Sequence, residues 1–142
     1  PGPILGVTLA FGTCMCVIFV FLADFVDQHP NVRLWWFFVT YATTGLSIRL
    51  GLRNWPDRFG AKPVLAAGMG LFTLGMVTFL FVSERHPYSL LVPGIICGAA
   101  HGVTFHAMVS TALAPFPPPA RGAGSTLALM GIDVGTFLSS QI

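Results

Sequence analysis

The sequence ILGVTLAFGTCMCVIFVFLA at residues 4–23 contains no charged residue. A helix needs about 20 apolar residues to cross roughly 30 Å of hydrocarbon, so this run is long enough to span a membrane. The whole chain has the same character, because 54% of its 142 residues are hydrophobic and only 8% are charged. A soluble domain carries roughly 25% charged residues. The composition therefore predicts an integral membrane protein.

The same composition argues against other classes of protein. Disorder requires low hydrophobicity and high charge. A net charge of +2 without a basic stripe argues against a nucleic-acid partner. Cys14, Cys16 and Cys97 all lie in apolar runs, so no disulfide framework is expected. A thiol metal site at Cys14 and Cys16 is conceivable, but small apolar helix residues are the ordinary interpretation, and we expect neither a metal nor a cofactor.

Four more apolar runs follow the first and are separated by short polar segments. The predicted helices lie at about 4–23, 34–52, 64–82, 88–114 and 125–142. We expect an all-α, polytopic membrane helix bundle of about five transmembrane helices in a single membrane domain over residues 1–142. Because the chain begins at Pro1 and stops inside an apolar run, we interpret it as a piece of a longer protein with a truncated fifth helix.

The basic residues predict which side of the membrane each connection faces. If the helices alternate in direction, the connections at 24–33 and 83–87 share one side, and those at 49–63 and 117–126 share the other. The first pair contains Arg33 and Arg85, whereas the second contains Arg49, Arg53, Arg58, Lys62 and Arg121. Cytoplasmic connections carry an excess of Lys and Arg, so the second pair and the N-terminus are predicted to be cytoplasmic.

Small residues recur at helical spacing in two of these runs. Gly68 and Gly75 are seven residues apart, and Gly98 and Gly102 form a GxxxG pattern. Lipid is as apolar as the helices, so membrane helices associate through close backbone packing rather than the hydrophobic effect. These glycines predict helix contacts and carry no further functional meaning.

The polar segment RLGLRNWPDRFGAKP at residues 49–63 carries a family resemblance. It resembles the loop G-x-x-x-D-R-x-G-R-[KR] that the major facilitator superfamily places between the second and third helices of each six-helix half, on the cytoplasmic side. Arg53 and Ala61 depart from that pattern. The resemblance implies a gating loop, and an orienting basic turn is the alternative. The matching residues are Asp57, Arg58, Gly60 and Lys62.

The residue types suit a gate on physical grounds as well. Asp57 can accept hydrogen bonds from the positive end of a helix. Arg58 and Lys62 can bind carboxylates or lipid phosphates. Gly60 permits a tight turn with positive φ.

A second resemblance covers the end of the chain. The segments GAAHG (98–102), APFPPPARGAG (114–124) and GIDVG (131–135) resemble helices ten and eleven of bacterial efflux-type carriers of this superfamily. Tyr41, Ala42 and Arg49 resemble positions in their eighth helix. The order and spacing imply helices seven to eleven of a twelve-helix carrier, although the corresponding helices of the N-terminal half stay possible.

The resemblance implies a secondary transporter that moves a small solute by alternating access between two bundles. No G-x-x-x-x-G-K-[ST] loop indicates ATP hydrolysis, so an ion gradient, above all protons, is the expected energy source. The expected partners are the solute, the coupling ion, the lipid bilayer and the rest of the chain. The expected location is the cell membrane, with several crossings.

Ionisable residues inside the predicted helices are candidates for substrate binding or proton coupling, because burying them in lipid is costly. Asp133 lies near half depth in the fifth run, with a structural hydrogen bond as the alternative role. His101 and His106 lie in the fourth run and point about 140° apart on a helix. Arg49 lies near the cytoplasmic end of the second run, where it can extend to the interface or pair with a carboxylate.

Two other functions compete with transport. Gly45-Leu46-Ser47 and Ala100-His101-Gly102 faintly resemble the Ser and His helices of rhomboid proteases, and a Ser47–His101 dyad would perform acyl transfer. Ile48 stands where that family's second glycine should follow the serine, and Arg49 comes next, near the membrane surface, so we expect no enzyme. The third possibility is a membrane scaffold or receptor that transports nothing.

Overall fold

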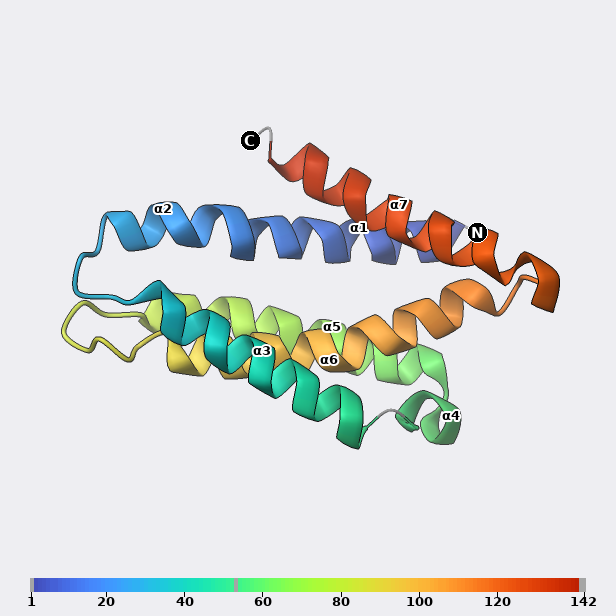
Figure 1. The fold of residues 1–142 in the computed structure, drawn as a ribbon, viewed down its shortest axis with the longest axis horizontal. Helices are drawn as coiled ribbons and strands as arrows, with labels where there is room; N and C mark the ends of the chain where they lie inside the picture. Colours follow the sequence, from blue (N-terminus) through green and yellow to red (C-terminus); the bar gives the residue numbers. More distant parts are fainter. Residues whose placement is uncertain (1, 53, 141–142) are drawn as a thin grey trace.

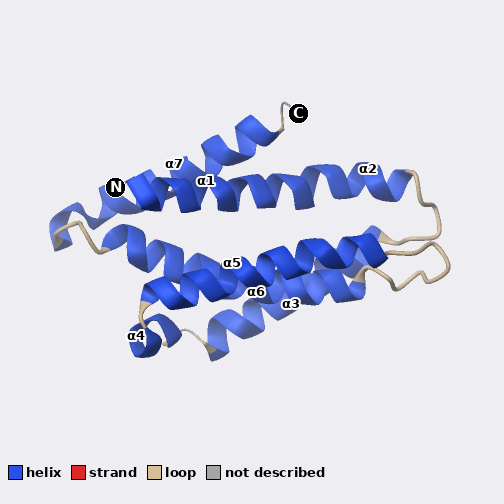
Figure 2. Ribbon diagram, turned by 180° about the vertical axis from the view of Figure 1, so that it is seen from behind, coloured by secondary structure: helices blue, strands red, loops and turns tan. Residues whose placement is uncertain are grey.

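The computed structural model describes residues 2–52 and 54–140, and within these ranges the chain is helical and has no strand (Figure 2). Arg53 and the last two residues of the predicted fifth helix lie outside the described residues. The secondary structure elements are α1 (Gly2–Cys16), a π-helical turn (Val17–Phe21), α2 (Leu22–Asp27), α3 (Leu34–Gly51), α4 (Trp55–Phe59), α5 (Ala61–Thr78), α6 (Leu91–Leu113) and α7 (Arg121–Ser139), with 3₁₀ turns at Phe79–Phe81 and Pro118–Ala120. The predicted all-α bundle is confirmed.

The helices form two groups (Figure 1). One group is α3, α5 and α6, in which both α3 and α5 pack against α6. The other group is α1 with α7 packed against it, and α2 continues α1 beyond the π-helical turn. The α2–α3 loop and the α5–α6 loop lie at one end of the bundle, and α4 and the α6–α7 turn lie at the other, as Figure 1 shows.

Glycines bring the helices of the first group into backbone contact. A β-carbon on Gly98 would collide with the carbonyl oxygen of Tyr41 in α3, and one on Gly102 would meet Ile48. On α5, Gly68 and Gly75 lie directly against Thr104 and Cys97 of α6. The glycine spacings that predicted helix contacts therefore mark both faces of α6: its GxxxG pair faces α3, and the glycine pair of α5 faces its other side.

Glycines also bring α1 and α7 into backbone contact. A β-carbon on Gly12 would collide with the Ile132 carbonyl, and one on Gly135 would collide with the Leu9 carbonyl. The hydroxyl of Thr136 donates a hydrogen bond of 3.2 Å to the Gly12 carbonyl across the same interface. Neither glycine was predicted from the sequence to form a helix contact.

Large side chains fill the space between the two groups. Phe11 of α1 is 2% exposed, and its ring lies 5.6 Å from that of Phe72 in α5 and 5.3 Å from that of His101 in α6. The hydroxyl of Tyr41 in α3 lies 3.5 Å from the sulfur of Met15 in α1. The core thus consists of long side chains between two groups that are each held together by backbone contact.

The observed helix ends differ from the expected ones. The first helical stretch continues to Asp27, so Asp24 and Asp27 lie in its last turns and not in the following loop. Helix α5 begins at Ala61, which places Lys62 and Pro63 in its first turn, where the missing N–H of proline costs no hydrogen bond. Helix α6 begins three residues later than residue 88, after a turn, and α7 begins four residues earlier than residue 125.

Three helical segments of the described chain are long and apolar enough to cross a membrane: Leu5–Asp27, Ala61–Phe81 and Leu91–Leu113. Helices α3 and α7 run beside them but are not among these three. Three helical segments therefore have the length and apolar composition that a membrane crossing requires, and the total of five crossings stays a prediction.

Candidate functional site

The predicted gating residues lie on and beside α4 at one end of the bundle. Gly60 directly follows α4 and has φ +87° and ψ 143°, and no other described residue has a positive φ. The positive φ expected at Gly60 is confirmed. Asp57, Arg58 and Lys62 are all exposed, and no ion pair joins them to each other or to other described residues. Their side chains are therefore accessible to groups outside the described part of the chain.

His101 lies in the middle of α6 and faces α3 and α1. Its Nδ1 is hydrogen bonded to the hydroxyl of Tyr41, and its ring contacts the rings of Phe11 and Phe105. A polar pair is thus enclosed by aromatic rings between the two helix groups. Tyr41 was noted in the sequence only as part of a resemblance. Its spacing from Gly45 and Arg49 could have indicated that Tyr41 faces α6, because residues four and eight positions apart lie on one face of a helix.

His106 lies in different surroundings, near the end of the bundle that carries α4. Its Nδ1 is buried and has no hydrogen-bond partner among the described residues. Arg49 of α3 lines the same small cavity, and its Nε is also buried without a described partner. The Arg49 guanidinium carbon lies 5.0 Å from the centre of the Phe105 ring, in a cation–π contact. Two of the predicted site residues are therefore brought together.

Asp133 lies apart from both histidines. It is exposed on α7, on the side that turns away from the glycines packed against α1. Its carboxylate forms no ion pair with a described residue. The carboxylate is therefore accessible to groups outside the described part of the chain.

The rhomboid-like pair is not assembled in this structure. The hydroxyl of Ser47 donates to the Thr43 carbonyl at 2.8 Å, while His101 is bonded to Tyr41. Ser47 lies about 200° around α3 from Gly45, which faces α6, so its side chain points away from His101. Among the described residues, no group of three or more His, Cys, Asp or Glu could hold a metal ion.

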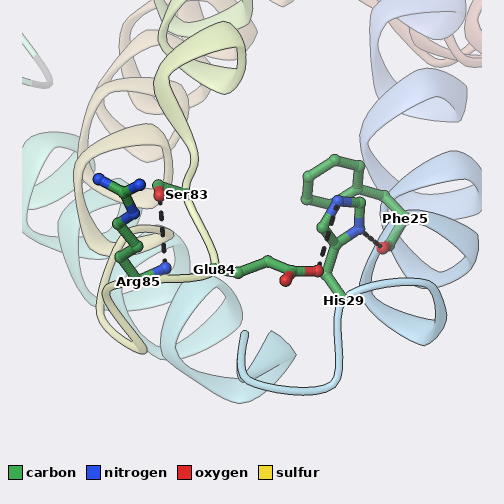
Figure 3. A network of polar contacts seen from close by, with 5 residues as sticks. All are labelled: Phe25, His29, Ser83, Glu84 and Arg85. Atoms are coloured by element: carbon green, nitrogen blue, oxygen red, sulfur yellow. Dashed lines mark hydrogen bonds and ion pairs between the residues drawn. The ribbon is translucent and has the colours of Figure 1, made fainter.

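At the opposite end of the bundle, an ionic contact between described residues joins the two loops. Nε2 of His29 lies 3.9 Å from the carboxylate of Glu84, and Nδ1 of His29 donates to the Phe25 carbonyl at 2.6 Å (Figure 3). Because Nδ1 carries the proton, Nε2 attracts the carboxylate only when the imidazole is also protonated there. The stacked rings of Trp35 and Trp36 lie at the start of α3 near this end, as expected at a membrane interface.

Comparison with known proteins gives one distant relative. The chain is 27% identical over 86 residues to the probable anion transporter 4, chloroplastic, of Arabidopsis thaliana. The match covers 61% of this chain and 16% of the length of that protein. No family model matches the chain, and no solved structure matches it.

This relative and the apolar helices support a coarse assignment. The chain is a multi-pass membrane protein with a distant similarity to a transporter. The similarity favours a role in transport over one in catalysis.

Proposed function

We propose that the chain is part of a secondary transporter of the major facilitator type, which moves a small solute across the cell membrane by alternating access. The observation that carries the proposal is the similarity to an anion transporter along 61% of a chain that contains three helices of membrane length. Polar groups enclosed between its helices, above all His101 with Tyr41, give such a carrier sites at which a solute or a proton can bind.

The arrangement of the helices is compatible with this mechanism. Alternating access requires rigid bundles that move relative to one another around a central site. Backbone contacts within α3, α5 and α6 and between α1 and α7, with large side chains packed between these two groups, suit a piece of one such rigid bundle. The relative is named an anion transporter, so anions are the first class of solute to test.

Flux measurement with the full-length protein in proteoliposomes tests the proposal. We expect uptake of a labelled inorganic anion that depends on a proton gradient and stops when a protonophore is added. A reconstituted protein that carries no solute under any gradient would indicate a scaffold or receptor instead. Covalent labelling of Ser47 by a fluorophosphonate would indicate the protease.

The gating role of the α4 loop predicts the effect of a single substitution. Asp57→Asn removes the charge that would attract a helix N-terminus and leaves the shape nearly unchanged. We expect flux to fall several-fold while the amount of inserted protein stays normal. Asp24→Asn, in α2 at the opposite end of the bundle, is the matched control. Equal flux for Asp57→Asn and the wild type would contradict the gate.

The proposed proton coupling predicts a different result at Asp133. Asp133→Asn cannot bind and release a proton, so we expect flux driven by a proton gradient to disappear. Exchange of labelled for unlabelled solute at equilibrium, which needs no net proton movement, should continue. Loss of both activities would indicate that Asp133 binds the solute or stabilises the fold.

A further inference from the structure

The contact between His29 and Glu84 joins two loops that are far apart in the sequence. His29 lies in the α2–α3 loop, directly after the helical stretch that α1 and α2 form, and Glu84 lies in the α5–α6 loop of the other helix group (Figure 3). No second ionic contact occurs among residues 2–52 and 54–140. This pair therefore links the two helix groups at the end of the bundle where both loops lie.

The hydrogen bond of His29 to the backbone determines when this contact forms. A carbonyl oxygen can only accept, so Nδ1 of His29 donates to the Phe25 carbonyl at 2.6 Å, and the neutral imidazole presents an unprotonated Nε2 to Glu84. Nε2 and the carboxylate oxygen, 3.9 Å apart, are then both acceptors. Protonation of Nε2 replaces this unfavourable pairing by an attraction between opposite charges. Histidine is the side chain that ordinarily changes its charge between about pH 5 and 8.

Neighbouring groups hold the two partners in place. The imidazole of His29 stacks on the Phe25 ring, with centroids 4.2 Å apart. In the α5–α6 loop, the backbone N–H of Arg85 donates to the hydroxyl of Ser83 at 3.3 Å, which orders the chain on both sides of Glu84. The guanidinium of Arg85 points away from the Glu84 carboxylate in Figure 3, so it does not compete with His29 for it.

Other ionisable groups at this end leave the pair undisturbed. None of them forms an ion pair with a described residue, and they comprise Asp24, Asp27, Arg33, Arg85, His86 and Tyr88. The protonation of His29 is therefore the change of charge that this contact responds to.

The helix that leads to His29 has space to shift. Helix α2 packs only lightly against α3, and it joins α1 through the π-helical turn, a form of helix that is frequent at functional sites. An apolar groove of about 220 Å³ separates this stretch from the end of α5 and is lined by Val17, Ile18, Leu22, Phe25, Met76 and Phe79. A smaller apolar cavity than this can hold a benzene ring, so a large side chain can move into it. The loop contact thus restrains a segment that is able to move.

We propose that His29 and Glu84 form a pH-dependent latch, which joins the α2–α3 loop to the α5–α6 loop when His29 is protonated and releases it when His29 is neutral. The latch is closed at acidic pH and opens as the pH rises. It follows from the contact itself and does not require that the protein transports a solute. The basic residues predict that this end of the bundle faces outside the cell, so the external pH would set the latch.

The exposure of the two side chains limits the strength of the latch. The side chains of His29 and Glu84 are 32% and 49% exposed, so water screens their attraction. An ion pair of this kind changes an equilibrium by about fivefold or less. A change of that size shifts the balance between joined and separated loops and leaves the helices folded.

Distances between spin labels on the two loops test the proposal in the purified full-length protein. The labels are attached to Gln28→Cys and Pro87→Cys, which replace exposed uncharged residues, and the partly exposed Cys14 is replaced by alanine. Pulsed electron spin resonance gives the ratio of joined to separated loops at pH 5.5 and pH 8.0. We expect this ratio to be several-fold higher at pH 5.5.

Substitutions of the two partners should remove that response. His29→Gln keeps an amide that can donate to the Phe25 carbonyl but cannot become charged, and Glu84→Gln removes the negative charge, so we expect either variant to show the same ratio at both pH values. His29→Arg stays protonated and should keep the loops joined at pH 8.0. His86→Gln is the matched control, because it removes the other histidine at this end and should retain the full pH response.

The double variant His29→Gln/Glu84→Gln distinguishes a direct contact from two separate effects. If the pair acts as one unit, the double variant behaves like either single variant, and the effects do not add. An unchanged pH response in His29→Gln or Glu84→Gln, or no response in the labelled parent protein, would overturn the latch. Loss of the response in His86→Gln would also overturn it, because the proton would then act at His86.

Discussion

The Tyr41 hydroxyl and His101 Nδ1 form a polar contact in a layer made otherwise of apolar and aromatic side chains. In such surroundings each group depends on the other, because water is scarce and an unpaired polar group costs about 1–3 kcal/mol. The hydroxyl lies within reach of both His101 and the sulfur of Met15, so it connects α3 to α6 and to α1.

Tyr41→Phe tests this contact. The substitution keeps the aromatic ring and leaves His101 Nδ1 without its hydrogen-bond partner, so we expect the free energy of unfolding to fall by about 1–3 kcal/mol. The pH profile of flux should also change, which a purely structural role would not require. Tyr88→Phe at the exposed loop end is the control and should alter neither quantity. An unchanged pH profile in Tyr41→Phe would assign the pair a structural role alone.

At the scale of residues, the sequence identified the ionisable groups but not their partners. The cost of placing His101, His106, Arg49 and Asp133 in apolar helices singles them out without any structure. That His101 meets Tyr41 and that His106 shares a cavity with Arg49 depends on the rotation of α6 against α3. This rotation is fixed by Gly45, Gly98 and Gly102 at their interface and is not contained in either helix alone.

The individual helices owe their positions to small residues more than to amphipathic patterning. Both faces of α6 carry close contacts, with Gly98 and Gly102 against α3 and with Thr104 and Cys97 against the glycines of α5. The apolar runs predicted where helices occur, and the glycine spacings predicted which faces touch. Helix ends were less predictable, because a helix can include polar residues such as Asp27 and Lys62 once its apolar part is in place.

The close contacts predict the effect of adding one methyl group. Gly98→Ala forces α3 and α6 apart at the Tyr41 carbonyl, and overpacking of this kind typically costs about 1–3 kcal/mol. Gly70→Ala in α5 is the matched control, because its β-carbon would meet nothing within 4 Å. That change should be neutral or slightly stabilising, since alanine favours helix more than glycine does. Unfolding of both variants in detergent, followed by circular dichroism, should show a lower midpoint only for Gly98→Ala.

At the scale of the whole molecule, the connections at the two ends of the bundle differ in their number of basic residues. The α2–α3 and α5–α6 loops share one end, and α4 and the α6–α7 turn share the other, as the alternation of helix directions requires (Figure 1). The end with α4 carries most of the basic residues of the connections. The charge bias thus predicts that this end faces the cytoplasm.

Cysteine labelling in intact cells tests that orientation. Lys62→Cys and Arg85→Cys place exposed thiols at opposite ends. The native Cys16 and Cys97 are buried, and the partly exposed Cys14 is replaced by alanine in both variants. We expect a membrane-impermeant maleimide to label Arg85→Cys from outside and Lys62→Cys only after the cells are permeabilised. The reverse pattern would place the N-terminus outside and invert the assignment of all connections.

The two kinds of contact within the bundle also set different limits on sequence change. At Gly12, Gly98 and Gly135 the glycine packs directly against the backbone of another helix and leaves no space for a side chain. Any replacement there therefore disturbs the helix contact. In the layer around Phe11 and Phe72, one large apolar side chain can replace another of similar volume at little cost. In a saturation mutagenesis library of this chain, we therefore expect the glycine positions at the helix contacts to tolerate no larger residue. Positions in the layer between the two helix groups should accept other large apolar residues.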